Sequence, residues 1–181
     1  GQTDLPALEN TGDEAIRASI TVIGQKAGIQ PAMAEGMEIR REILDEEGKP
    51  LAPASLRQNQ LVIVRLTGRL IRPVRSRALI VDYLPAGLEL ENPATGGIGV
   101  NEFKWLGRGS KVDHRELRDD RFVAALELDN RKSVKRGTFS VSYIARAVTP
   151  GRFAFGNAIV EDMYRPSLRG LTSVAEVAIV P

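Results

Sequence analysis

The side chains that most often carry out acid–base, nucleophilic or metal chemistry are scarce in this sequence. The chain of 181 residues contains one histidine, His114, and no cysteine. It therefore has no thiolate nucleophile, no disulfide and no second histidine for a histidine-based zinc site or acid–base pair. A Ser-His-Asp triad is formally available, but no serine lies in a nucleophile-elbow sequence, and no glycine motif for phosphate is present. We expect no catalytic residue, no metal site and no cofactor.

Adjacent carboxylates could serve glycoside hydrolysis or metal binding. They occur at Glu46–Glu47, Asp119–Asp120 and Glu161–Asp162. Neighbouring residues in a strand point to opposite faces, and arginines flank the second pair, so ion pairing satisfies its charges. This pattern predicts a structural ion-pair network rather than a catalytic or metal site. The network would consist of Arg118, Asp119, Asp120 and Arg121.

A basic stretch could contact phosphate, anionic lipid or an acidic protein surface. It consists of Arg65, Arg69, Arg72, Arg75 and Arg77. It contains no aromatic residue to stack on a base, and the formal net charge of the whole chain is only +2. The stretch is more typical of a solvated strand edge, and we expect no nucleic-acid partner. No apolar run approaches the ~20 residues of a membrane helix, so direct membrane insertion is not expected either.

Hydrophobic residues alternate with a period of two along most of the chain, as in half-buried β-strands. Residues 37–45 fit the period of a strand or of a helix, and the EEGKP turn that closes them favours a β connection. The clearer strands are predicted at 18–25, 60–71, 76–83, 122–129, 138–148, 157–163 and 173–180. The predicted core includes Val64, Phe122, Leu126, Phe139 and Val141. About eight or nine short strands with turn residues between them predict an all-β fold, an antiparallel β-sandwich.

A long glycine-rich connection at 92–110 carries the only tryptophan, Trp105. It exceeds the usual loop length of about a dozen residues, and we expect a short strand within it at 102–106. Asp113 and Glu116 have the spacing of a capping box, which predicts one helical turn.

The most specific motif is the run Val160-Glu-Asp-Met-Tyr-Arg-Pro166, which lies shortly before the last predicted strand. Three more stretches accompany it: VDYLPAGLELENP at 81–93, HRELRDDRFVAA at 114–125 and YIARAVTPGRF at 143–153. Together they resemble the C-terminal macroglobulin domain of bacterial alpha-2-macroglobulins over residues 36–181. The resemblance implies an immunoglobulin-like sandwich. It also implies that residues 1–35 are a linker and the last strand of a preceding, CUB-like domain.

In that family the full chain is a broad-spectrum protease trap whose buried thioester reacts with the protease. The resemblance implies that Met163 and Tyr164 pack over the thioester of the neighbouring domain and keep water from it. The structural alternative is that both side chains belong to the core of this sandwich. The thioester's own Cys-x-x-Gln element is absent, so this chain alone is expected to trap nothing covalently.

The resemblance also implies partners and a location. The expected partners are the thioester domain and other macroglobulin domains of the same chain, target proteases bound by the intact trap, and a periplasmic peptidoglycan synthase. The expected location is the periplasm, with the full-length protein anchored at the inner membrane as a lipoprotein. The chain begins at Gly1 rather than Met, which favours a fragment of a longer protein.

Two other readings stay open. One is an independent adhesion or ligand-binding sandwich that uses the 92–110 loop and Trp105 to contact carbohydrate or protein. The other is an enzyme fragment with an unrecognised carboxylate site.

Overall fold

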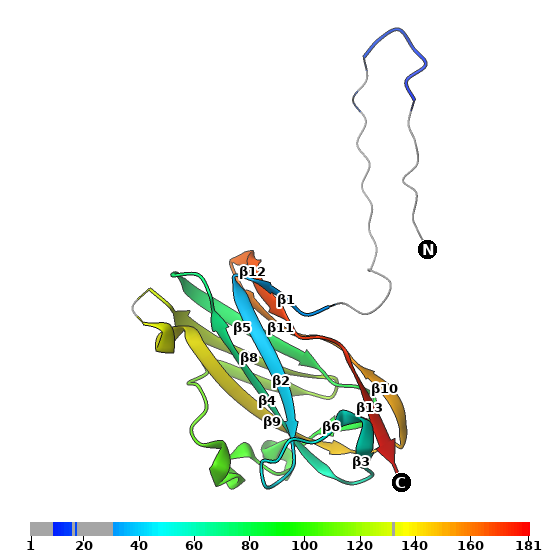
Figure 1. Ribbon diagram of the computed structural model, residues 1–181, viewed down its shortest axis with the longest axis vertical. Helices are drawn as coiled ribbons and strands as arrows, with labels where there is room; N and C mark the ends of the chain where they lie inside the picture. Colours follow the sequence, from blue (N-terminus) through cyan, green and yellow to red (C-terminus); the bar gives the residue numbers. More distant parts are fainter. Residues whose placement is uncertain (1–8, 16, 18–30, 132) are drawn as a thin grey trace.

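The computed structural model describes residues 9–15, 17, 31–131 and 133–181, and in them two β-sheets face each other with a small third sheet beside them (Figure 1). The strand predicted at 18–25 lies outside the described residues. The only helices in the described part are 3-10 turns of three or four residues. The all-β sandwich prediction is confirmed.

The larger sheet has six strands in the order β1-β12-β11-β5-β8-β7, and every neighbouring pair is antiparallel. Its strands are β1 (Met33–Glu35), β5 (Arg75–Tyr83), β7 (His114–Arg118), β8 (Arg121–Asp129), β11 (Ala158–Asp162) and β12 (Arg165–Leu171). The outer strand β1 pairs with β12, so the described sheet begins at Met33, slightly before the domain start predicted at residue 36.

The opposing sheet has four antiparallel strands in the order β2-β4-β9-β6. They are β2 (Met37–Leu44), β4 (Leu61–Leu70), β9 (Thr138–Ala147) and β6 (Leu88–Leu90). The ambiguity at 37–45 is thus resolved as a strand. The third sheet combines β10 (Gly151–Phe155), β13 (Ala175–Val180) and β3 (Leu56–Arg57), and its β13–β3 pair is parallel.

The main core lies between the two larger sheets. All five residues predicted for it are buried: Val64, Phe122, Leu126, Phe139 and Val141. Phe122 of β8 stacks on Tyr143 of β9, with ring centroids 4.8 Å apart, so an aromatic pair joins the two facing sheets. The predictions of which side chains of β4, β8 and β9 face the core are therefore correct.

The 92–110 connection does not hang free in solvent. It forms 3-10 turns at Pro93–Thr95, Val100–Glu102 and Lys104–Leu106, and it covers the outer face of the four-stranded sheet. Ile98, Val100, Phe103 and Leu106 pack there on Leu44, Leu61, Ile63 and Ile144. The strand predicted at 102–106 is wrong, because these apolar residues reach a sheet face through turns instead of joining a ladder.

Trp105 anchors this connection to the β2–β3 segment. Its indole N–H donates to the carbonyl oxygen of Glu46 at 2.7 Å, and its ring covers Gly48, where a Cβ would approach the ring to 2.8 Å. The residue is nonetheless 37% exposed. The indole is thus held against the β2–β3 segment with part of its surface open to solvent.

The helical turn predicted at 113–116 is also wrong. His114–Arg118 forms β7, which pairs with β8 along its whole length. Pairing with β8 supplies ladder hydrogen bonds that a single helical turn cannot match, so tertiary pairing overrides the local capping signal.

Two further 3-10 turns lie at Pro53–Ser55 and Val134–Gly137.

Candidate interdomain contact site

Met163 and Tyr164 form the two-residue tip of the hairpin between β11 and β12, at the upper end of the sandwich in Figure 1. Met163 is 45% exposed and Tyr164 is 76% exposed. Neither belongs to the core, so the structural alternative in which both pack inside this sandwich does not hold. Two large apolar side chains are thus presented together at a surface.

Asp162, immediately before the tip, fixes the backbone that presents the pair. Its Oδ1 accepts hydrogen bonds from the N–H groups of Tyr164 at 2.9 Å and Arg165 at 2.8 Å. The Arg165 guanidinium binds Oδ2 at 2.8 Å and also donates to the carbonyl oxygen of Arg75. Met163 N–H donates to the carbonyl oxygen of Arg77 at 2.9 Å. The tip is therefore tied both to its own hairpin and to β5.

The carboxylate of Asp162 is 1% exposed, and its pKa reflects two opposing effects. Burial raises the pKa, but the Arg165 guanidinium, the Ser76 side chain and the backbone N–H groups of Tyr164 and Arg165 together lower it more. The net shift is downward from 3.8. The folded state thus favours the ionised carboxylate.

We expect Asp162→Ala to destabilise the domain by about 1–3 kcal/mol at pH 7, because two backbone donors and Arg165 lose their acceptor. A lowered pKa contributes stability above the unfolded value of 3.8, and this contribution is lost as pH falls through the folded value. The difference between wild type and variant in denaturant unfolding should shrink below about pH 4. A difference that stays constant from pH 7 to pH 2 would contradict this account of the carboxylate.

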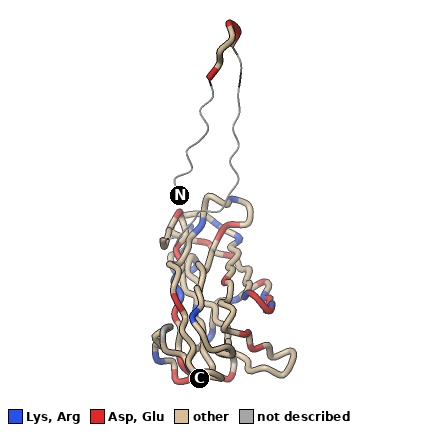
Figure 2. Tube along the Cα trace, turned by 90° about the vertical axis from the view of Figure 1, so that its right-hand side faces the viewer, with Lys and Arg blue, Asp and Glu red and all other residues tan. Residues whose placement is uncertain are grey.

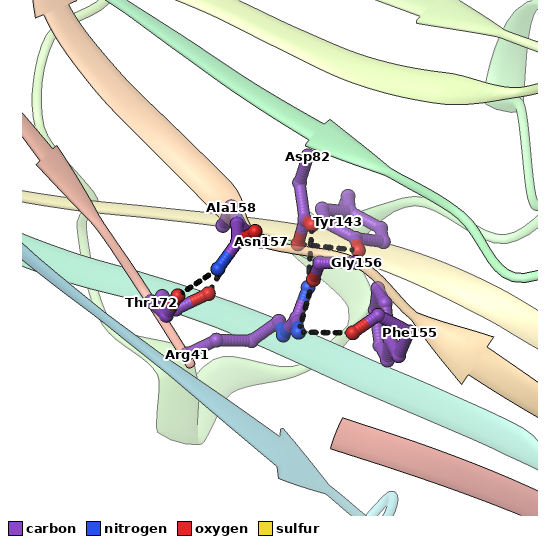
Figure 3. A network of polar contacts seen from close by, with 8 residues as sticks. All are labelled: Arg41, Asp82, Tyr143, Phe155, Gly156, Asn157, Ala158 and Thr172. Atoms are coloured by element: carbon purple, nitrogen blue, oxygen red, sulfur yellow. Dashed lines mark hydrogen bonds and ion pairs between the residues drawn. The ribbon is translucent and has the colours of Figure 1, made fainter. Parts of the chain in front are cut away.

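The strongest polar cluster of the described structure lies inside the sandwich and was not predicted from the sequence. Arg41 of β2, 5% exposed in its side chain, binds the fully buried carboxylate of Asp82 on β5 at 2.7 Å. Its second terminal nitrogen donates to the carbonyl oxygens of Phe155 at 3.3 Å and Gly156 at 2.7 Å. The Tyr143 hydroxyl donates to the other oxygen of Asp82 at 2.9 Å. Figure 3 shows these groups converging from separate strands.

Burial shapes the electrostatics of this cluster. It raises the pKa of Asp82, while Arg41 and the Tyr143 hydroxyl oppose the rise because both stabilise the carboxylate. Burial also raises the pKa of Tyr143 well above 10.0, and the charge of Asp82 adds to that effect. The Arg41 guanidinium lies 3.5 Å from the centre of the Phe155 ring. Every partner of Arg41 is therefore inside the fold, and the cluster has the character of an internal clamp between sheets.

A sequence signal for this cluster existed. Arg41 occupies the inward phase of β2 with Met37, Ile39 and Ile43, and Asp82 occupies the inward phase of β5 with Ala78 and Ile80. A charged residue in an apolar phase predicts a buried partner of opposite charge. The partner itself lies 41 residues away, and the sequence pattern alone does not identify it.

The turn between β7 and β8 holds the other predicted cluster. Arg121 pairs with Asp120 at 3.2 Å, but Arg118 pairs with Glu116 at 2.7 Å and not with an aspartate of the turn. The predicted network of Arg118, Asp119, Asp120 and Arg121 thus becomes two exposed pairs. Because Arg121 lies opposite Tyr83 and Asp162 lies opposite Ala78, this turn and the Met163–Tyr164 tip are at opposite ends of the six-stranded sheet.

The basic stretch is solvated and paired at three positions, but the strand edge predicted for it is wrong, because β4 and β5 are both interior strands of their sheets. Arg65 pairs with Glu42, Arg69 with Glu38 and Arg75 with Glu127. Figure 2 shows basic and acidic residues interspersed along the strands. Within the described residues, no three His, Asp or Glu side chains gather closely enough to hold a metal ion. The same residues contain no helix with the length and apolar character needed to cross a membrane.

The structure is an all-β sandwich with an exposed hairpin tip, and comparison with known proteins identifies its family. Residues 36–167 match the family model described as the bacterial alpha-2-macroglobulin MG10 domain. The chain belongs to this family, and the resemblance stated from the sequence is confirmed.

The relatives agree with this assignment. Alpha-2-macroglobulin of Escherichia coli strain K12 is 34% identical over 96% of this chain, and that of Xylella fastidiosa strain 9a5c is 34% identical over 93%. The chain spans about a tenth of the length of these curated relatives, 11% and 10% respectively.

Solved structures give the same result. Native E. coli alpha-2-macroglobulin, spanning domain MG7 to the C-terminus, matches with a TM-score of 0.73 and 34% identity over 87% of this chain and 25% of that chain. Salmonella alpha-2-macroglobulin reacted with methylamine matches with a TM-score of 0.73 and 33% identity, over 87% of this chain and 10% of that chain. The chain is thus a domain of a bacterial alpha-2-macroglobulin.

Proposed function

We propose that this domain packs against a thioester-bearing domain of the full-length chain and shields the thioester from water through Met163 and Tyr164. The observation that carries the proposal is the exposed apolar pair held at a hairpin tip by a buried aspartate. A thioester is an activated acyl group that survives only where water is excluded. The polarizable Met side chain and the broad Tyr ring are suited to covering it.

The relatives support this proposal by their described states. E. coli alpha-2-macroglobulin is known in forms activated by trypsin and by porcine elastase, and the Salmonella protein in a form reacted with methylamine. Proteins that proteases activate and that react with an amine fit the proposed trap. We propose the same for the full-length protein that carries this domain, with this domain a non-catalytic part of a broad-spectrum protease inhibitor.

The decisive experiment replaces the pair in the full-length protein. Met163→Ala combined with Tyr164→Ala should admit water, so that free thiol appears and methylamine incorporation falls before any protease is added. The fold of this domain should stay intact, since exposed side chains contribute within about 0.5 kcal/mol to stability.

A matched control removes two other exposed apolar side chains. Tyr83→Ala with Val134→Ala, which are 45% and 66% exposed in the wild type, should leave the thioester as long-lived as before. Equal thioester lifetimes in the Met163–Tyr164 variant and the wild type would refute the shielding role. Equal losses in both variants would refute it as well, because the effect would then be nonspecific.

The cellular setting is part of the same proposal. We propose a periplasmic location, anchoring of the full-length protein at the inner membrane, and association with a peptidoglycan synthase and target proteases. Fractionation of cells with an antibody to this domain tests the location, and recovery in the cytoplasm would overturn it.

A further inference from the structure

A groove of ≈ 370 Å³ lies where the segment after the 3-10 turn Lys104–Leu106 crosses β9 beside the start of β7. It is separate from the Met163–Tyr164 tip, and nothing in the proposed function uses it. Its polar lining is rich in donors, namely Arg108, Ser110, Lys111, Arg115, Ser140 and Ser142.

The segment is held in place by backbone contacts with β9. Ser110 N–H donates to the carbonyl oxygen of Ser140 at 2.8 Å, and Ser140 N–H donates to the Ser110 hydroxyl at 2.9 Å. These two bonds fix the point between Arg108 and Lys111. Arg108 and Lys111, on either side of this point, both line the groove.

The charges of the groove are not balanced locally. No carboxylate is among its lining residues. Asp113, the acid closest in sequence to Lys111 and Arg115, does not line the groove and forms no ion pair with either of them within 4.0 Å. Glu116 binds Arg118 at 2.7 Å, and Glu102 accepts from the N–H of Gly99 at 3.3 Å. Among the residues that the structure describes, no ion pair involves Arg108, Lys111 or Arg115, while the arginines of the basic stretch at 65, 69 and 75 are all paired.

The strand edge adds a backbone donor. The carbonyl oxygens of Ser140 and Ile144 accept from Ser110 and Glu91, so these residues direct their backbone groups away from β4. Because the direction alternates along an antiparallel strand, Ser142 between them directs both its N–H and its carbonyl oxygen to the same edge, beside the groove. Arg115 of β7 also lines the groove, and its guanidinium lies 5.7 Å from the centre of the Phe122 ring.

We propose that this groove is an oxyanion-binding site that takes a phosphate or carboxylate group. Guanidinium and ammonium groups are donors only, and serine hydroxyls and a strand-edge N–H can complete a donor set around oxygens. Arginine forms charge-assisted hydrogen bonds to the oxygens of a planar carboxylate or a tetrahedral phosphate. A neutral sugar, in contrast, would leave the three cations without a counter-charge.

Titration with inorganic phosphate at constant ionic strength, with chloride as the replaced anion, tests the site. Two-dimensional amide NMR should show saturable shifts at Gly107, Gly109, Lys111 and Ser142. Arg108→Ala with Lys111→Ala should weaken phosphate binding about tenfold, as expected for the loss of charged hydrogen bonds. A parallel titration with acetate shows whether a phosphate or a carboxylate is the preferred source of the oxyanion.

Lys135→Ala with Arg136→Ala provides the matched control, since it removes the same charge from an exposed 3-10 turn that does not line the groove. This control should bind phosphate within about twofold of the wild type, because long-range charge effects are screened by salt. Shifts that never saturate, or equal weakening in the two double variants, would overturn the site and leave only general charge attraction. Because the tip residues are unchanged in both variants, failure here does not affect the shielding proposal.

Discussion

Asp82→Ala should destabilise the domain by about 3–5 kcal/mol, because it leaves the buried guanidinium of Arg41 without its counter-charge. Arg41 would keep only the carbonyl oxygens of Phe155 and Gly156, and the Tyr143 hydroxyl would lose its acceptor. The measurement is the free energy of unfolding from urea denaturation at pH 7.

Two companion variants separate the ion pair from simple surface charge. Glu176→Ala removes one partner of the exposed Arg152–Glu176 pair and should cost less than about 1 kcal/mol. Arg41→Met added to Asp82→Ala should cost less than the sum of the two single changes, since it removes the uncompensated charge. A cost of Asp82→Ala no larger than that of Glu176→Ala would show that the internal clamp does not stabilise the fold.

Leu126→Ala should cost about 2–5 kcal/mol, because Leu126 is 3% exposed and its removal opens a cavity between the two facing sheets. Val134→Ala, at a residue 66% exposed, should stay within about 0.5 kcal/mol of the wild type. The free energies of unfolding of both variants, measured by thermal and urea denaturation, test these two expected values. Similar small effects of the two changes would mean that Leu126 does not face the core as described.

The central strands β8 and β9 could be predicted because every inner-face position is apolar, whereas polar residues recur on the outer face. The alternation of β8 from Phe122 to Leu128 and of β9 from Phe139 to Ala147 marks the core directly. The short strands β1, β3 and β6 were missed, because two or three residues carry no measurable period. In β12, the exposed start Arg165–Ser167 hides the pattern.

The connection at 92–110 was misjudged for a different reason. Its apolar residues cover the outer face of β4, where Leu61 and Ile63 are buried as well as the inward Val62 and Val64. A strand buried on both faces gives a continuous apolar run, which the sequence shows but which does not identify the covering segment.

The hairpin tip was predictable from its motif, and its exposure follows from the position of both residues in a turn. The internal clamp was harder, because the charged residues in the inward phases of β2 and β5 indicate that each needs a buried partner but do not say which residue it is. The oxyanion groove depends on a loop crossing a strand edge, and such tertiary crossings leave no local pattern in the sequence.

The clamp also bears on the order in which the chain can fold. Arg41 and its acceptor on Gly156 are separated by 115 positions, and Asp82 and Tyr143 are separated by 61. Forming contacts this distant in sequence requires closing large loops, and the entropy lost in doing so comes before the contacts stabilise the fold. Folding is therefore slower than in a domain whose contacts are mostly local in sequence. During synthesis from the N-terminus, Arg41 and Asp82 emerge well before Phe155 and Gly156. The two sheets therefore acquire their complete internal ion-pair cluster only when nearly all of the domain has been made.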